Sequence, residues 1–216
     1  MHYQFLIEDQ SSTALIEIIM PKIIINNKDA TFNCKSFKGL GGLKKKNTAK
    51  AIKTGKLLSD LAIYLRGFDK SLKYIPSVIV TVLDNDKRNT QAFQRELENI
   101  AIQNHISIDH VFCIAVEEVE AWLLGDKQAI IAAYPKAKVQ IINSYRQDSI
   151  CGTWEVLADA IYPGGLTEFR KDCPTFIEIG KFKKLWAETI GGKMDISNNK
   201  SPSFNLFLQE INKRLP

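Results

Sequence analysis

Apolar runs of strand length alternate with segments of helical periodicity through the first half of the chain. The clearest run is VIVTVL, residues 78–83, in which β-branched and apolar residues follow one another without alternation. A strand buried on both faces has this pattern, and such strands are typical of parallel sheets. Similar runs predict further strands at residues 3–7, 31–37 and 110–116.

The segments between these runs have the apolar spacing of amphipathic helices. Helices are predicted at residues 12–25, 55–66 and 91–103. Ser11 or Ser12 is expected to cap the first of them and Thr90 the third, and Pro21 is expected to kink or end the first. Strands that alternate with helices indicate βαβ units. We therefore predict an α/β fold with a mainly parallel four-stranded sheet and flanking helices.

The strand signal fades beyond about residue 125. Helices are predicted at residues 127–134, 153–162, 179–189 and 204–215, and polar turns with Gly and Pro separate them. The chain is therefore predicted to have two parts. Residues 1–125 form the α/β core, and residues 126–216 form a helical C-terminal region packed on that core.

The composition is that of an ordinary globular protein, with 216 residues of which 45% are hydrophobic and 25% charged. No stretch reaches the roughly 18 apolar residues of a membrane span, and the N-terminus lacks the pattern of a signal peptide. The four cysteines show neither a CxxC pair nor metal-ligand spacing, which favours reduced thiols. We therefore expect a cytoplasmic protein that does not contact a membrane.

Carboxylates follow three of the predicted strands: Glu8, then Asp84 and Asp86, then Glu117, Glu118 and Glu120. The carboxyl ends of parallel strands share one edge, so these acids are expected to gather there. Acids with period-two spacing can point the same way, and close carboxylates need a proton, a cation or a structural partner. Hard cations such as Mg²⁺ take oxygen ligands of this kind. The alternative for the two aspartates is a strand-to-helix turn with Asp as an N-cap.

The three glutamates are expected to differ in exposure. Glu117 is expected at the surface, whereas Glu120 precedes Ala121 and Trp122 in an apolar context, so exposure explains it poorly. Glu118 and Glu120 share a face if the strand continues, while a helix that starts at once makes Glu117 and Glu120 neighbours instead.

Positive charge is concentrated near the N-terminus. Residues 1–60 carry the whole net charge of +5, mainly through Lys35, Lys38, Lys44, Lys45, Lys46, Lys50, Lys53 and Lys56. Three glycines in the same stretch, FKGLGGLKKKN, allow close backbone approach and positive φ. Clustered lysines can grip phosphates without reading sequence, so Lys38, Lys44, Lys45 and Lys46 are candidate phosphate-binding residues; a solvated loop is the alternative.

The order of these motifs resembles a known domain. A strand ending in Glu, a second strand, and a strand ending in DxD are similar to the Toprim domain of topoisomerases, primases and OLD-type nucleases. The stretches FLIED, VLDND, AVEEVEAWLLGD and DSICGTWEVLADAIYPGG resemble a family of small, uncharacterised Toprim-like bacterial proteins. In OLD-type sequences the glutamate is often followed by Gly, and this chain has Asp9 there instead.

The resemblance implies specific roles. Glu8 matches the Toprim glutamate, Asp84 and Asp86 match the metal-binding pair, and Glu118 and Glu120 match the acidic stretch before AW. It also implies a tie to phage defence or mobile elements, with a partner ATPase, and a homodimer is a further option.

Together these features predict a Mg²⁺- or Mn²⁺-dependent phosphodiesterase, a nuclease acting on DNA or RNA. Its catalytic residues would be Glu8, Asp84, Asp86 and Glu120, with Glu118 as a further metal ligand. A non-catalytic module of the same fold, binding nucleic acid or a partner ATPase, is the alternative.

Overall fold

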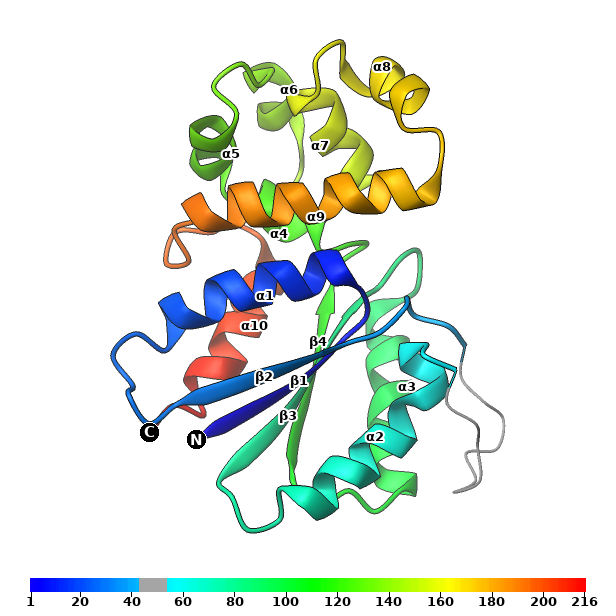
Figure 1. Ribbon diagram of the computed structural model, residues 1–216, viewed down its shortest axis with the longest axis vertical. Coiled ribbons are helices and arrows are strands. Elements are labelled where there is room, and N and C mark those ends of the chain that lie inside the picture. Colours follow the sequence, from blue (N-terminus) through cyan, green and yellow to red (C-terminus); the bar gives the residue numbers. More distant parts are fainter. Residues whose placement is uncertain (43–53) are drawn as a thin grey trace.

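The computed structural model describes residues 1–42 and 54–216. The described chain forms a four-stranded parallel sheet of order β2-β1-β3-β4 with helices on both faces (Figure 1). The strands are β1 (His2–Ile7), β2 (Thr31–Ser36), β3 (Ser77–Asp84) and β4 (Asp109–Ala115). The helices between them are α1 (Gln10–Ile23), α2 (Leu57–Ser71) and α3 (Thr90–Gln103). This architecture confirms the predicted α/β class and the parallel sheet.

The two faces of the sheet bury different helices. Tyr3, Phe5 and Val80 lie on the face covered by α1 and by the last helix, α10 (Pro202–Asn212). Leu6 and Ile79 lie on the face covered by α2 and α3. Every residue of β3 is buried, which is why its sequence shows no alternation.

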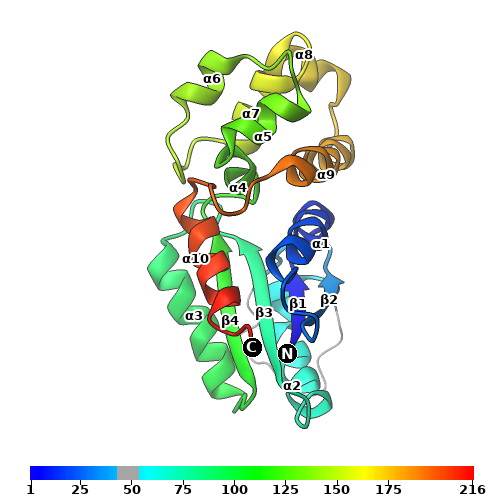
Figure 2. The same ribbon diagram turned by 90° about the vertical axis from the view of Figure 1, so that its left-hand side faces the viewer.

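The helical region lies beyond the carboxyl ends of the strands (Figures 1 and 2). It contains α4 (Glu120–Leu124), α5 (Lys127–Ala133), α6 (Val139–Ser144), α7 (Thr153–Ile161), α8 (Gly165–Asp172) and α9 (Phe176–Lys193). Helix α10 then returns to the sheet, where Trp122 of α4 stacks on Phe207 at a centroid distance of 5.0 Å. Among the described residues, no helix is long and apolar enough to cross a membrane.

Helix α9 packs along α1 and brings the helical region close to the core (Figure 1). Gly191 permits this approach, because a Cβ atom there would lie 2.8 Å from the Leu15 side chain. Lys22 of α1 donates hydrogen bonds to the carbonyl groups of Gly191, Gly192 and Met194 at 2.9–3.0 Å. The two helices are therefore joined by the close approach at Gly191 and by hydrogen bonds from the Lys22 side chain to backbone carbonyl groups.

The helix caps differ from the expected ones. Asp9, rather than Ser11 or Ser12, caps α1 by accepting the Ser12 N–H at 2.8 Å. Asn89, rather than Thr90, caps α3. Pro21 lies inside α1 without ending it. Helices α4, α6 and α8 had no predicted counterpart; each has eight residues or fewer, which gives too little periodicity to detect.

Candidate carboxylate site

Carboxylates connect the ends of three strands at one edge of the sheet. Glu8 follows β1, and its Oε2 accepts the backbone N–H of Asp84 at 3.0 Å. Asp84 ends β3, and its Oδ1 accepts the backbone N–H of Val119, in the segment after β4, at 3.0 Å. Asp84 is buried and belongs to the same face as Val82, which is the face covered by α1. The expected convergence of Glu8 and Asp84 is therefore present.

A buried lysine of the helical region lies among these acids. Lys183 of α9 is 12% exposed, and its Nζ lies 3.1 Å from Glu120 Oε2 and 3.4 Å from Glu118 Oε1. Glu120 is fully buried, and among the described residues its carboxylate makes no hydrogen bond apart from this contact with Lys183. We call Glu8, Asp84, Glu118, Glu120 and Lys183 the carboxylate cluster.

Sequence reasoning missed Lys183. A signal was present, because Lys183 falls on the apolar face of the predicted helix, four residues after Ile179 and three before Trp186. A lysine on a core-facing stripe is rarely buried without a partner. The partners themselves, Glu118 and Glu120, lie too far away in the sequence to be recognised from spacing.

The electrostatics reflect an excess of acid over base. Burial, followed by the nearby charges of Asp9 and Asp86, raises the pKa of Glu8 to about 7, although the Asp84 N–H opposes the shift. Burial raises the pKa of Glu120 to about 7, with Lys183 opposing the shift. Burial and the Glu8 charge hold the pKa of Asp84 well above its usual range.

The pKa of Lys183 shifts in the direction set by its acidic partners. Burial alone would lower the pKa of Lys183, but the charges of Glu120, Glu118 and Asp84 outweigh it and raise the pKa. One ammonium group thus serves several buried carboxylates, and the raised pKa values of Glu8 and Glu120 mean that the cluster holds protons near neutral pH.

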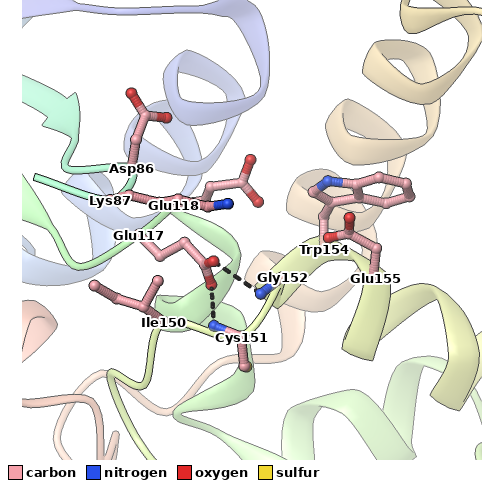
Figure 3. A pocket seen from close by; sticks show the side chains of 9 residues that line it. All are labelled: Asp86, Lys87, Glu117, Glu118, Ile150, Cys151, Gly152, Trp154 and Glu155. Carbon is pink, nitrogen blue, oxygen red and sulfur yellow. Dashed lines mark hydrogen bonds between the residues drawn. The ribbon is translucent and has the colours of Figure 1, made fainter.

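Glu117 has a structural role in this region. Its carboxylate accepts the backbone N–H groups of Cys151, Gly152 and Thr153 at 3.1, 2.8 and 2.9 Å, at the start of α7 (Figure 3). It is buried, so the expected surface position was wrong. Its φ of 64° is an uncommon backbone conformation for glutamate. The AVEEVEAWLLGD and DSICGTWEV stretches are therefore joined through a single side chain.

Asp86 lies in the turn after β3, where its side chain is more than half exposed while its charge still acts on Glu8. The strand ends at Asp84, and Asp86 takes a φ of 48°. Its backbone N–H donates to the Glu117 carbonyl at 2.9 Å, and its carboxylate pairs with Arg88 at 2.6 Å. Figure 3 shows the Asp86 side chain pointing away from Glu117. The period-two geometry expected for the DxD pair is lost at this turn.

A hollow of about 450 Å³ opens beside the cluster. Asp86, Lys87 and Glu118 line one side of it, and Cys151, Trp154 and Glu155 of the helical region line the other (Figure 3). The turn at residues 148–152 both caps a helix and lines the hollow. Asp148 accepts the Ser203 N–H at 2.6 Å at the start of α10, while Cys151 and Gly152 face the hollow.

The lysine loop begins next to the cluster. The backbone N–H of Gly39, just after Lys38, donates to the Glu8 carbonyl at 2.9 Å, which fixes the start of the loop at the carboxyl edge. Lys38 is exposed, and its carbonyl accepts a hydrogen bond from Lys56. Lys44, Lys45 and Lys46 lie outside the described residues.

The donor atoms of the cluster suit a hard divalent cation. Glu8, Asp84, Glu118 and Glu120 supply carboxylate oxygens, and those of Glu120 make no hydrogen bond within the described chain apart from the contact with Lys183. No group of three or more His, Cys, Asp or Glu side chains in residues 1–42 and 54–216 is arranged to hold a metal ion. The chemistry of the donors fits Mg²⁺ or Mn²⁺, while Lys183 supplies the positive charge in this arrangement.

Comparison with known proteins gives no relative. The chain matches no family model, no curated protein and no solved structure. The Toprim-like assignment therefore stays a prediction from the motifs, and the fold and the carboxylate cluster carry the functional interpretation.

Proposed function

We propose that this protein is a Mg²⁺- or Mn²⁺-dependent phosphodiesterase that acts on the backbone of nucleic acid. The observation that carries the proposal is the gathering of carboxylates from separate segments around one buried lysine at the carboxyl edge of a parallel sheet. Ligands of open α/β sheets bind at this edge. Strongly perturbed pKa values of buried acids beside a specific charge partner cluster at functional sites.

Each residue of the cluster has a defined task in this proposal. Asp84, Glu118 and Glu120 would hold the cation, which when bound neutralises phosphate charge and aligns the attacking water. Glu8 would take a proton from the attacking water as the water oxygen bonds to phosphorus, while the ester P–O bond breaks and the leaving oxygen takes a proton from solvent. Asp86, outside the cluster, lines the adjoining hollow.

Lys183 sets a condition on metal binding. Its ammonium group contacts two of the proposed ligands, so a cation gains full access to Glu118 and Glu120 only when these ion pairs loosen. The freed ammonium group could then contact a phosphate oxygen as a point charge. The Gly39 backbone fixes Lys38 at the same edge, which supports a phosphate contact there.

Calorimetry with Mn²⁺, paired with cleavage assays on single-stranded and duplex DNA and on RNA, tests the proposal. The decisive variant is Asp84→Asn, because an amide oxygen can still accept the Val119 N–H and the fold is retained. Glu96→Gln on α3 is the control, since Glu96 is an exposed acid on another face. We expect Asp84→Asn to abolish metal binding and cleavage together, and Glu96→Gln to leave both unchanged. A folded wild-type protein that binds no divalent cation would contradict the proposal.

A second function is favoured by one specific observation. Lys183 already neutralises part of the acidic charge, so the cluster can be stable without a metal. A Toprim-like module that binds nucleic acid or a partner ATPase without catalysis would have this property. Acid-to-amide variants that leave binding intact, in a protein that cleaves nothing, would favour it. In either case we place the protein in a reducing compartment such as the cytoplasm, because its four cysteines are free thiols.

A further inference from the structure

Two large apolar side chains stand in solvent at the start of α9. Phe176 is 92% exposed and Ile177 is 74% exposed, and they are adjacent in the first turn. Single exposed apolar residues are common on protein surfaces, whereas contiguous ones near a cleft mark binding surfaces. Their surroundings therefore decide whether they have a function.

Phe176 lines two hollows, and one of them is also lined by Lys183 of the carboxylate cluster. One, of about 350 Å³, is lined by Trp154, Arg170 and Phe176 among others. The other, of about 300 Å³, is lined by Phe176, Ile177, Lys181, Lys183 and Lys184 and by the start of α1. Trp154 also lines the hollow of Figure 3. Neighbouring hollows thus share a wall residue, Trp154 or Phe176, and Lys183 of the carboxylate cluster lines one of them.

Basic side chains alternate with these aromatic rings. The Arg170 guanidinium lies 5.9 Å from the centroid of the Trp154 ring. Lys181 and Lys184 are exposed on the next turns of α9. Aromatic platforms interleaved with cations are the physical requirements for binding single-stranded nucleic acid, in which bases stack on the rings and cations contact phosphates.

We propose that this surface, defined by Trp154, Arg170, Phe176, Lys181 and Lys184, binds single-stranded nucleic acid and leads it to the carboxylate cluster. The inference rests on the proposed function and names the form of its substrate. A single strand fits better than a duplex because only unpaired bases present a face to Phe176 and Trp154. Arg170 and Lys184 pair with Glu155 and Glu188 at 3.5 and 3.7 Å, in solvent-accessible contacts that phosphate groups can replace. With Lys181 they favour a polyanion over an apolar peptide as the occupant.

Fluorescence anisotropy with labelled oligothymidylate and oligouridylate tests the surface, in a buffer with a metal chelator so that no cleavage occurs. Phe176→Ala should weaken binding by about five-fold or more, the usual effect of losing one stacking contact. Lys181→Ala should reduce the steepness of the salt dependence by about 0.7 in the log–log slope. Phe176 is almost fully exposed, so its substitution leaves the fold intact.

Tyr74→Ala is the matched control. Tyr74 is 89% exposed and lies beside Lys73, with the ammonium group 5.7 Å from the ring centroid, but it precedes β3 at the opposite edge of the sheet. We expect this variant to bind like wild type. Trp154 gives a second readout, because Trp122 and Trp186 are buried and bases stacked on Trp154 should quench mainly its emission.

The outcomes separate this inference from the proposed function. Three results would contradict the proposed binding surface: equal affinities of wild type and Phe176→Ala, tighter binding of a duplex, or no binding of any strand by wild type. The last result would point to a protein partner instead. Hydrolysis of a small chromogenic phosphodiester needs no such surface. If that hydrolysis persists in Phe176→Ala and is lost in Asp84→Asn, the proposed function stands whatever happens to strand binding.

Discussion

Lys183 should be needed for stability at high pH and much less needed at low pH. Replacing it by Met keeps a side chain of similar length and removes the charge. At an effective dielectric constant of about 20, charges at the two measured separations of 3.1 and 3.4 Å attract by about 5 kcal/mol each. The cost of burying Lys183 offsets several kcal/mol of this attraction. We therefore expect Lys183→Met to lower the free energy of unfolding by about 3–5 kcal/mol, the usual loss when one partner of a buried ion pair is removed.

The pH dependence follows from the acids that lose their partner. Glu120 and Glu8 have pKa values of about 7 in the folded protein, so at about pH 8 the variant leaves buried negative charges uncompensated. At about pH 5 both groups hold protons, and only the pairing with Glu118 is lost, so the destabilisation should shrink. Urea denaturation of wild type and variant at the two pH values measures the difference.

Lys184→Met provides the control for this experiment. Lys184 is the next residue of α9, and it pairs with Glu188 at 3.7 Å on the exposed side of the helix. Exposed pairs contribute about 0–1 kcal/mol, so this variant should be near wild type at both pH values. A loss for Lys183→Met that is equal at the two pH values would refute the electrostatic reasoning. A loss below about 1 kcal/mol at high pH would show that the lysine is not the counter-ion of the cluster.

Three further predictions follow from the same region. Glu8 and Glu120 have a pKa of about 7 in the folded protein and about 4.5 in the unfolded chain, so the stability of the metal-free protein should fall by up to about 3 kcal/mol for each carboxyl as pH rises from about 4.5 to 7. Added Mn²⁺ should raise the melting temperature more at high pH, and a free energy of unfolding that does not change with pH in urea denaturation would contradict the prediction. Glu117→Ala should lose about 2 kcal/mol or more, because three N–H groups lose their acceptor, and an unchanged urea midpoint would argue against that role. Gly125→Ala should cost about 1–3 kcal/mol, since its Cβ would lie 2.0 Å from the Asn199 amide oxygen, whereas Gly192→Ala meets no neighbour and should be neutral or stabilising; the melting temperatures of the pair test this.

The sheet could be predicted from the sequence because each strand shows a local pattern of apolar residues. Strand β3 is buried on both faces, so its apolar run is continuous, and the parallel arrangement then places Glu8 and Asp84 at one edge. The direction of Asp86 could not be obtained in the same way. It depends on where the strand stops, and Asp86 lies beyond that point with a positive φ, so the period-two rule of a strand does not apply to it. Asn and Asp favour such turns, so the sequence DND was a weak indication that the strand ends there.

The roles of Glu117 and Lys183 depend on contacts between distant segments. Glu117 binds backbone groups 34 to 36 residues later, and Lys183 pairs with a glutamate 65 residues earlier. Periodicity reports which face of an element is buried, but it does not report what lies against that face. For this reason the contacts of Glu117 left no sign in the sequence, and the place of Lys183 on an apolar face indicated a partner without identifying it.

The return of α10 to the sheet has a consequence for how the chain folds. The hydroxyl group of Tyr3, on the central strand β1, donates to the Ile211 carbonyl, and Arg214 pairs with Asp109 at the start of β4. These contacts join segments 208 and 105 residues apart in the sequence, and loops of this length are slow to close. A nascent chain therefore cannot seal this face of its core until residues 202–214 have left the ribosome. Until then Phe207 does not cover Trp122, and the exposed apolar face of the sheet can bind a chaperone.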